Sequence, residues 1–379
     1  MKDGSVCNMS NKHPNTLNLF LTGRCNLDCK YCFVNKSGHE KSILKEADMK
    51  KTIDIFLGYP GKSKTIGFSG GEPTIEFELL RRVCDYALRR AKKAGKRLDI
   101  AVVTNGTLLD QRMVDFFRTR RILVRVSIDG EEETHDQKRS SRAGSASHSK
   151  IMKNLSALKD LDKLQLTASM VFAPDNLQYL MRNIRFINRL NFSAIDFYPD
   201  LYAEWQERDL QRFEKVMAEF SLYYSRLFLE NSPKIFKNSL IDSIVNGTRI
   251  SKLASCSKMN LGFDGRFYAC DKGLSLDNEA RDKYAIGSVA QGADIRKKDA
   301  LLQELEAAFL VESGLQCRGC RFYDYCFCPA GHIIHYAGRK NKKKLWRSFC
   351  RLSMTFNKNF FVLVEHIGKN ERFWKVYRR

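Results

Sequence analysis

The sequence predicts an α/β protein in which about six βα units build a parallel sheet and a smaller, irregular, cysteine-rich region follows. Short β-rich runs alternate with amphipathic stretches over the first two-thirds of the chain, which is the pattern of βα units. Polar motifs follow several of these runs, and most of the 12 cysteines lie in two clusters. With 379 residues, of which 43% are hydrophobic, the chain can bury the cores of two or three domains of roughly 150 residues each.

The expected strands are six short runs separated by helical patterns. The runs are 17–21, 65–68, 98–103, 122–128, 164–172 and 194–198. Between the second and third runs, apolar residues recur at helical spacing from Leu79 to Ala91, with Cys84 among them, and Gly95 ends the helix. Parallel α/β proteins place their active sites just after the strands, so we expect functional residues at those positions.

The character of the sequence changes after about residue 230. It becomes rich in Gly, Cys and Lys with weak periodicity, and Asn231-Ser232-Pro233 indicates a break. We therefore expect one domain over residues 1–235 and a second over residues 236–379. Core burial alone would not hold such an irregular segment, so we expect bound metal to contribute much of its folding free energy.

The chain carries no signal for a membrane or for export. Its apolar runs are short, such as Phe360 to Val364, whereas a membrane helix needs about 20 residues. The segment from Met1 to Thr16 lacks the apolar core and cleavage site of a secretory signal. These features predict a cytoplasmic protein. Thiols stay reduced in that compartment, where clustered thiols more often bind metal than form disulfides.

A loop after the first strand carries Cys25, Cys29 and Cys32 in the spacing Cys-x3-Cys-x2-Cys. Three thiolates on one loop can bind three irons of a [4Fe–4S] cluster and leave the fourth iron without a protein ligand. The loop resembles the signature of the radical S-adenosylmethionine (radical SAM) enzymes, in which an aromatic residue, here Tyr31, precedes the last cysteine. In that family the open iron binds the amine and carboxylate of SAM. A zinc site completed by His39 is the alternative.

Further motifs resemble the SAM contacts of this family. Ser69-Gly70-Gly71-Glu72, after the second strand, is similar to the motif that holds the SAM amine, and its glycines let the backbone approach a ligand closely. The resemblance also implies ribose and carboxylate contacts after the third and fourth strands, with ordinary turn chemistry as the alternative. The remaining candidates for cofactor binding are Asn105, Ser127, Asp129, and Arg139 in a His-Asp-x-x-Arg stretch similar to that of relatives acting on peptides and proteins.

The second cysteine cluster resembles a SPASM domain, a C-terminal extension that carries two auxiliary [4Fe–4S] clusters. The resemblance implies two ligand sets, which are Cys317, Cys320, Cys326 and Cys350 for one cluster and Cys256, Cys270 and Cys328 for the other. The second set has three members, so one iron should lack a cysteine ligand. A single residue separates Cys326 from Cys328, where the family has three. A pair of zinc sites is the alternative.

One carboxylate and the charge balance bear on catalysis and partners. Asp271 follows Cys270, and sulfatase-maturing relatives carry a proton-accepting Asp after the equivalent cysteine; an exposed turn carboxylate is the alternative. The 65 Lys and Arg exceed the 43 Asp and Glu by 22. Basic runs such as 339–351 attract acidic partners. We favour an acidic peptide over nucleic acid, because the SPASM resemblance points to peptides and no nucleic-acid motif is present.

The resemblance as a whole implies a partial (β/α)6 radical SAM barrel followed by a SPASM domain, with three [4Fe–4S] clusters and SAM as cofactors. A reducing partner such as a flavodoxin or ferredoxin would supply the electron that breaks SAM to a 5′-deoxyadenosyl radical, and that radical would abstract a substrate hydrogen atom. The leading hypothesis is a maturase of a ribosomally made peptide that forms a thioether or another cross-link.

Two alternatives stay open. The first is an anaerobic sulfatase-maturing enzyme, which forms formylglycine. It is disfavoured because such relatives have an additional cysteine between the positions of Cys256 and Cys270. The second is a non-catalytic Fe–S or zinc protein that binds nucleic acid through its positive charge.

Overall fold

The computed structural model describes residues 13–32, 34, 41–141, 143–230, 232–247, 256–276, 278–329, 333–334 and 342–377. The chain divides into two compact units. The first unit comprises Met1–Arg24, Phe33–Ile100 and Ser251–Ala307, and the second comprises Cys25–Cys32, Ala101–Ile250 and Ala308–Arg379. The units interleave along the chain, and the domain boundary near residue 235 stays a prediction. No helix in the described ranges is both long enough and apolar enough to cross a membrane.

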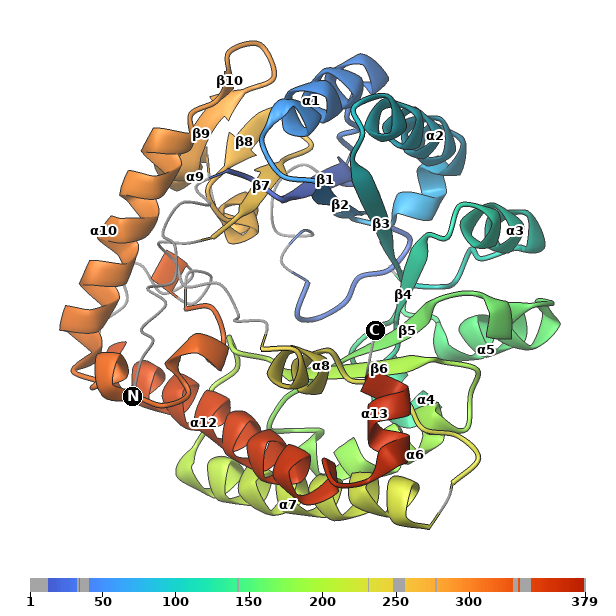
Figure 1. Cartoon of the computed structure of the whole chain (residues 1–379), viewed down its shortest axis with the longest axis vertical. Helices are drawn as coiled ribbons and strands as arrows, with labels where there is room; N and C mark the ends of the chain where they lie inside the picture. Colours follow the sequence, from blue (N-terminus) through green and yellow to red (C-terminus); the bar gives the residue numbers. More distant parts are fainter. Residues whose placement is uncertain are drawn as a thin grey trace. The chain divides into compact units, whose positions relative to one another are not determined.

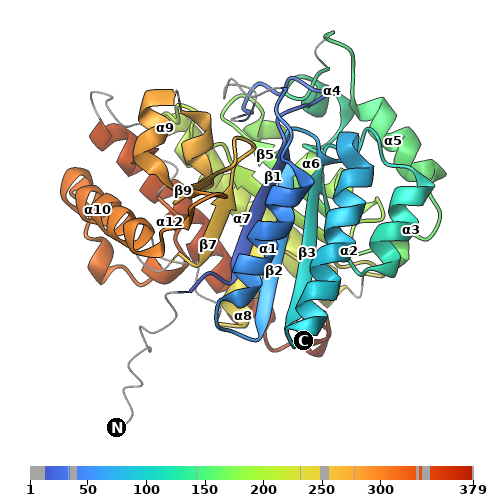
Figure 2. The same cartoon turned by 90° about the horizontal axis from the view of Figure 1, so that it is seen from above.

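The first unit contains the strand order β10-β9-β8-β7-β1-β2. These strands are β1 (Thr16–Thr22), β2 (Ser63–Gly70), β7 (Lys258–Leu261), β8 (Arg266–Tyr268), β9 (Ala285–Ser288) and β10 (Gly292–Ala293). β1 pairs in parallel with β2 and with β7, whereas β7 to β10 pair antiparallel. Helices α1 (Glu46–Gly58) and α2 (Phe77–Lys93) pack side by side over β1 and β2 (Figures 1 and 2). The other helices are η1 (Pro73–Glu76), η5 (Asp271–Ser275), α9 (Asn278–Tyr284) and α10 (Ile295–Ser313), whose residues from Ala308 onward belong to the second unit.

The second unit contains the remaining parallel strands in the order β3-β4-β5-β6. They are β3 (Arg97–Thr104), which begins in the first unit, β4 (Leu123–Ser127), β5 (Leu166–Phe172) and β6 (Ala194–Pro199). Helices between consecutive strands cover one face of this sheet (Figure 1). They are α3 (Gln111–Thr119), α4 (Glu132–Asp136), α5 (His148–Ala157), η2 (Leu161–Lys163), η3 (Leu177–Tyr179) and α6 (Leu180–Asn188). The unit ends with α7 (Glu207–Leu229), α8 (Ser239–Val245), η6 (Cys317–Gly319), η7 (Tyr323–Tyr325), α12 (Lys342–Ile367) and α13 (Glu371–Tyr377).

The predicted α/β class and its strands are confirmed. All six expected runs form strands, β1 to β6, in a parallel arrangement. The run expected from residue 164 begins only at Leu166, because Leu161–Lys163 forms a 3-10 turn just before it. The helix expected over Leu79 to Ala91 is α2, and Cys84 is fully buried on its inner face.

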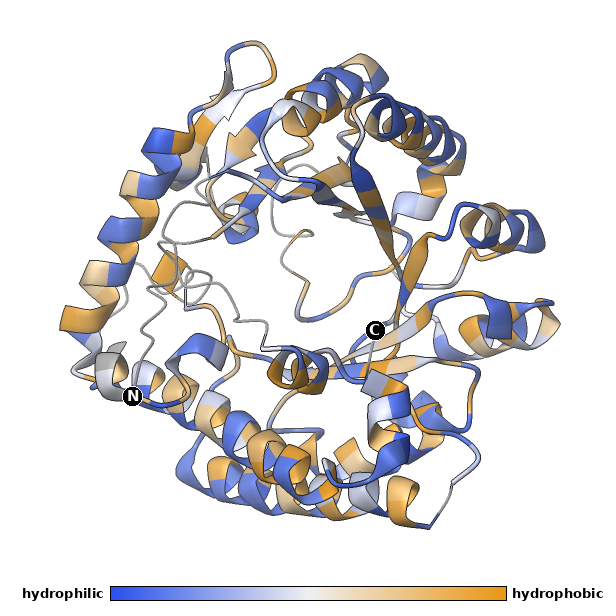
Figure 3. Cartoon of the chain, in the orientation of Figure 1, coloured by the Kyte–Doolittle hydropathy of each residue, from blue (hydrophilic) through white to orange (hydrophobic). Residues whose placement is uncertain are grey.

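The region after residue 235 is more regular than expected. α12 is a helix of 26 residues, and its Phe356 and Phe360 rings lie 5.2 Å from Phe213 and 5.7 Å from Phe220 of α7, respectively. The expectation of weak periodicity was wrong for this stretch, because lysines and Cys350 interrupt an apolar repeat that is helical. Figure 3 shows hydrophobic residues along both helices. Each buried phenylalanine contributes roughly 1.5–3 kcal/mol, so core packing also stabilises this region.

Candidate active site

The loop with the first three cysteines belongs to the second unit and is held by the segment that follows α4. Asp28 N–H donates to the Ser140 carbonyl at 2.9 Å, and Lys30 N–H donates to the Lys138 carbonyl at 2.9 Å. Leu27 forms an isolated antiparallel bridge with the same segment. These backbone bonds alternate with the cysteines along the loop, so main-chain contacts position the loop.

The loop cysteines are half-buried thiols outside any disulfide. Burial raises the pKa of Cys29 to about 11, although the nearby Arg139 guanidinium opposes that shift. Cys32 and Asp129 raise the pKa further, because their negative charges disfavour a second one. A buried thiol of this kind loses its proton readily only to a metal ion, which replaces the positive charge. The loop therefore fits an iron–sulfur cluster, and His39 of the zinc alternative lies outside the described residues.

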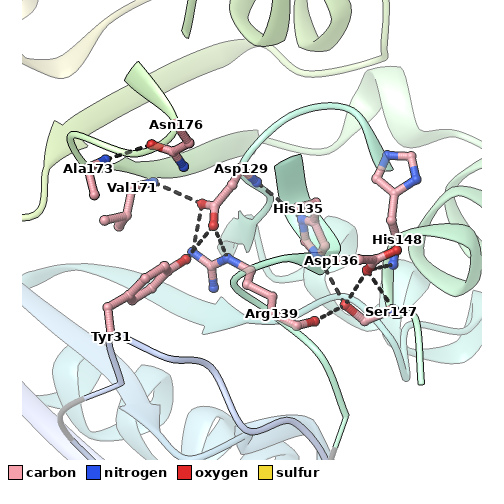
Figure 4. Close-up of polar contacts among 10 residues, drawn as sticks. All are labelled: Tyr31, Asp129, His135, Asp136, Arg139, Ser147, His148, Val171, Ala173 and Asn176. Atoms are coloured by element: carbon pink, nitrogen blue, oxygen red, sulfur yellow. Dashed lines mark hydrogen bonds and ion pairs between the residues drawn. The ribbon is translucent and has the colours of Figure 1, made fainter. Parts of the chain in front are cut away.

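Beside the loop, Tyr31, Asp129 and Arg139 form a closed polar network (Figure 4). Tyr31 Oη donates to Asp129 Oδ2 at 2.5 Å. Arg139 donates from Nε at 2.9 Å and from Nη2 at 3.1 Å to the two carboxylate oxygens, and its guanidinium lies 5.0 Å from the Tyr31 ring centre. Val171 N–H is a fourth donor at 2.9 Å. Both oxygens of Asp129 are thus engaged by the protein, and the carboxylate orients Tyr31 and Arg139.

His135 links Asp129 to Arg139 through Ser147. It was not among the site residues that the sequence predicts. Its Nδ1 accepts the Asp129 N–H at 3.2 Å, and its Nε2 lies 3.0 Å from Ser147 Oγ, which donates to the Arg139 carbonyl (Figure 4). Burial lowers the pKa of His135 to about 4, so the ring is neutral at pH 7. With Nδ1 accepting, the proton is on Nε2. The His-Asp-x-x-Arg stretch contains this residue, but its partner Ser147 lies beyond the motif.

Asn105 directly follows β3 and Ser127 is the last residue of β4, at the strand ends where they were expected. Asn105 Nδ2 donates to Asn26 Oδ1 at 2.8 Å and lies 4.0 Å from Cys25 Sγ. Asn105 Oδ1 accepts from Thr107 N–H at 3.0 Å. The amide is therefore bonded to the cysteine loop itself. Ser127 is half-buried at the last position of β4, opposite Ser169 of β5.

In the first unit, the Gly-Gly-Glu turn packs on the residues that directly precede Cys25. Gly71 N–H donates to the Thr22 carbonyl at 2.6 Å, and Glu72 N–H donates to the Arg24 carbonyl at 2.7 Å. A Cβ on Gly71 would lie 2.1 Å from the Arg24 oxygen, and Gly70 adopts a φ of +137°. Only glycine fits both positions. Glu72 is buried, with Oε1 accepting from Thr74, while Ser69 pairs with β1 at the end of β2.

Cys256 and Cys270 flank the hairpin of β7 and β8 in the first unit. The register pairs Asn260 with Tyr268, which brings the outer ends of both strands, and hence both cysteines, to one end of the hairpin. Cys270 Sγ donates to Asp271 Oδ1 at 3.4 Å. Burial alone would raise the pKa of Asp271, but Lys272 and Lys258 hold it below its usual value. Asp271 is therefore an ionised carboxylate at pH 7.

Four cysteines of the second unit share one site formed by η6, η7 and α12. Burial raises the pKa of Cys326 to about 12 and of Cys350 to about 11, and both are raised further by Cys317 and Cys320. Cys317, Cys326 and Cys350 are thiols whose pKa is raised by burial and by neighbouring cysteines, which fits a group that replaces their protons with metal. In the described ranges no three His, Cys, Asp or Glu side chains converge on a single metal ion. The ligands of a four-iron cluster are spread more widely, because the irons lie between them. Cys328 is exposed.

Comparisons with known proteins place the chain in a class. The model of the radical SAM superfamily matches residues 19–187. A serine-type anaerobic sulfatase-maturating enzyme of Bacteroides thetaiotaomicron is 30% identical over 350 residues, covering 83% of this chain and 82% of that protein. The chain therefore belongs to the radical SAM superfamily, as the cysteine loop indicated, and it is an enzyme.

Within that superfamily the chain is a relative of the anaerobic sulfatase-maturating enzymes. A solved structure described as native anSMEcpe with bound AdoMet has a TM-score of 0.71 and 19% identity, covering 92% of this chain and 99% of that chain. This likeness confirms the radical SAM fold. A second relative is TigE, a radical SAM cyclopropyl synthase of Paramaledivibacter caminithermalis, with 26% identity over 54% of this chain and 46% of that protein. SAM and a [4Fe–4S] cluster are thus the cofactors that the cysteine loop fits.

Proposed function

We propose that this enzyme is a maturase that oxidises a residue of a peptide, with a thioether or other cross-link as the favoured product. The observation that carries the proposal is the cysteine loop built against the Tyr31, Asp129 and Arg139 network. When bound, the cluster and SAM supply a 5′-deoxyadenosyl radical that abstracts a hydrogen atom from the substrate. Relationship to sulfatase-maturating enzymes and to TigE supports a peptide or protein as that substrate.

The residues around the loop would bind and orient SAM. Cys25, Cys29 and Cys32 would hold three irons, and the Glu72 carboxylate would accept from the SAM amine. Arg139 would present its remaining N–H donors to the SAM carboxylate, because Asp129 fixes the other side of the guanidinium. Asp129 thereby acts through Arg139 instead of contacting SAM. The remaining candidates for SAM contacts are Tyr31, Ser69, Gly70, Gly71, Asn105 and Ser127.

The C-terminal cysteines would hold two auxiliary clusters. Cys317, Cys320, Cys326 and Cys350 would fill one of them, a ligand set supported by the electrostatic influence of Cys317 and Cys320 on both Cys326 and Cys350. Cys256, Cys270 and Cys328 would hold the other and leave one iron open for a substrate thiolate. Closing a C–S bond removes two hydrogens from the peptide. One leaves as the abstracted atom, and the other as a proton plus an electron that passes to an auxiliary cluster.

The decisive test is anaerobic SAM cleavage by the reconstituted enzyme with dithionite as reductant. Cys29→Ala should abolish the formation of 5′-deoxyadenosine, because an incomplete ligand set cannot hold the cluster. Cys84→Ala is the matched control, since Cys84 is a buried core residue of α2. The control should retain cleavage within about twofold. Equal cleavage by both variants would remove the assignment.

Sulfatase maturation is the second candidate. It is favoured by the 30% identity to a sulfatase-maturating enzyme and by the ionised Asp271 next to Cys270. Asp271→Asn separates the candidates by its products with two peptides, one carrying a sulfatase-type serine or cysteine and one acidic and cysteine-rich. Formylglycine formation that depends on Asp271 would establish sulfatase maturation. Cross-linking would be established if the cysteine-rich peptide loses the mass of two hydrogens and the segment closed by the cross-link does not fragment in tandem mass spectrometry.

The expected partners are a substrate peptide, whose acidic character follows from the positive charge of the chain, and a reducing protein. The net charge of +22 favours an acidic peptide, and a flavodoxin or ferredoxin would be the reductant in a cytoplasmic setting. Nucleic acid is the competing partner. A salt-sensitive affinity for RNA of arbitrary sequence that equals the affinity for every peptide tested would favour nucleic acid as the partner.

A further inference from the structure

Beside the four-cysteine site of the second unit, one serine contacts a sulfur. Ser353 lies on α12, three residues after Cys350 and therefore on the same face of the helix. Its side chain is 1% exposed, and its Oγ lies 3.0 Å from Cys326 Sγ. The helix thus supplies one cysteine of the site directly and touches a second through a hydroxyl.

The direction of this hydrogen bond is fixed by a second contact. Phe327 N–H donates to Ser353 Oγ at 3.0 Å, so the oxygen already accepts a bond and its own proton is free for the sulfur. A metal-bound Cys326 is a thiolate without a proton, so only the serine can be the donor. Asn357 Nδ2 donates to the Ser353 carbonyl at 2.9 Å one turn later and is itself buried, which further fixes this turn of the helix.

We propose that Ser353 sets the reduction potential of the auxiliary cluster held by Cys317, Cys320, Cys326 and Cys350. This inference rests on the cluster assigned under the proposed function. Reduction adds one electron to the cluster and makes its sulfurs more negative. A hydroxyl that donates to one of these sulfurs stabilises the reduced form more than the oxidised form. Ser353 is a positioning residue for electron acceptance and contacts no substrate.

A hydrogen bond inside a buried site is effective for this purpose because no water competes with it. Hydrogen bonds to the sulfurs and solvent exposure are the principal means by which a protein tunes such a cluster. Ser353 adds a donor without admitting water. The potential of this cluster should therefore lie above that of the same cluster without the hydroxyl, which makes it a better acceptor of the electron released when the substrate radical closes.

The test isolates this cluster in the full chain. Replacing Cys25, Cys29, Cys32, Cys256 and Cys270 by Ala leaves Cys328 as the single remaining ligand of the other two clusters, which cannot hold a cluster alone, so about four irons per chain should remain. Potentiometric titration followed by electron paramagnetic resonance then gives the midpoint potential. Ser353→Ala should make reduction about tenfold less favourable, which is a shift of about 59 mV to lower potential. Ser353→Thr should restore the value, because it keeps the hydroxyl.

Ser348→Ala is the matched control, since Ser348 lies on the same helix and its hydroxyl donates to the carbonyls of Trp205 and Lys344. It should leave the potential unchanged. A second readout is the coupling of an exchangeable proton to the reduced cluster, compared in H2O and D2O. The unsubstituted enzyme should show it and Ser353→Ala should lose it.

The outcomes separate this inference from the proposed function. If the isolated protein holds no iron, the auxiliary cluster itself is wrong. If iron is retained and Ser353→Ala changes neither the potential nor the proton coupling, the role of Ser353 is wrong while the cluster stands. If Ser353→Ala fails to retain iron, the test is the proton coupling measured in the protein that keeps Ser353. The absence of a strongly coupled exchangeable proton in that protein would overturn the hydrogen bond to the cluster.

Discussion

Two cysteine sites of the second unit are built in different ways. The Cys25–Cys32 loop is fixed by backbone bonds to residues 138–141 and lies beside a network in which four donors surround one carboxylate. The four-cysteine site at η6, η7 and α12 is lined by thiols, and Cys326 among them accepts a hydrogen bond from Ser353. The first site is shaped by polar contacts before metal binds. In the second, Phe327 packs on Phe356 of α12 and bonds to Ser353, and we expect metal to add most of the remaining order of the turns.

Breaking the network should give the largest effect. Asp129→Ala leaves the Arg139 guanidinium buried without its carboxylate, which should lower the free energy of unfolding by about 3–5 kcal/mol. Urea unfolding of the purified variant measures this. Arg182→Ala is the control, because its ion pairs with Glu131 and Glu133 are exposed and should cost less than about 1 kcal/mol. Equal losses in the two variants would mean that the network does not stabilise the site.

His135 should make the same network sensitive to acid. Its pKa is about 4 in the folded protein against about 6.5 unfolded, so between these values only the unfolded chain binds the proton. Stability contributed by the neutral ring is present above pH 6.5 and falls by about 3 kcal/mol as the pH drops to 4.

His135→Gln keeps a donor near the Nε2 position and removes the titration. The stability difference between the unsubstituted protein and this variant should therefore shrink as the pH falls from 7 to 4. His366→Gln, an exposed site on α12, is the control and should show a constant difference. A constant difference for His135→Gln would show that the ring is not held neutral.

Removing iron should act on the two sites unequally. In protein produced without iron, amide hydrogen exchange should rise at least about tenfold over residues 314–329, where short turns carry the thiols. Residues 125–139 should change less than about threefold, because hydrogen bonds and the parallel sheet hold them. Equal acceleration in both segments would contradict the idea that only the C-terminal site depends on metal.

The smallest effect concerns charge. Lys343 and Lys344 are exposed at the start of α12, and replacing both by Gln should slow association with an acidic peptide about twofold while leaving dissociation unchanged. Stopped-flow kinetics at low and high salt measure this. Salt should remove the difference, because exposed charges are screened over ~10 Å at 0.1 M. A change in the dissociation rate alone would place these lysines inside the interface.

The features that could be predicted from the sequence are those specified by residues close together in the chain. Strands, the cysteine loop and the Gly70-Gly71 turn follow from short-range patterns, and the paired close contacts explain why glycine stands at both positions. The bonds of His135 to Ser147 and of Ser353 to Cys326 join residues 12 and 27 positions apart, and no local pattern specifies them. α12 was missed for a different reason, since a periodic apolar face was hidden by lysines and a cysteine.

Because α12 both supplies residues to the sulfur site and packs on α7, its length is restricted in evolution. One face carries Cys350 and Ser353 to the sulfur site, and another packs Phe356 and Phe360 on α7. Substitutions on the outer surface leave both faces in place. Inserting or deleting one residue between Cys350 and Phe356 would rotate one face against the other by about 100°. Only a change of a whole turn, three or four residues at once, preserves both alignments, so the length of this segment should be far less variable than its composition.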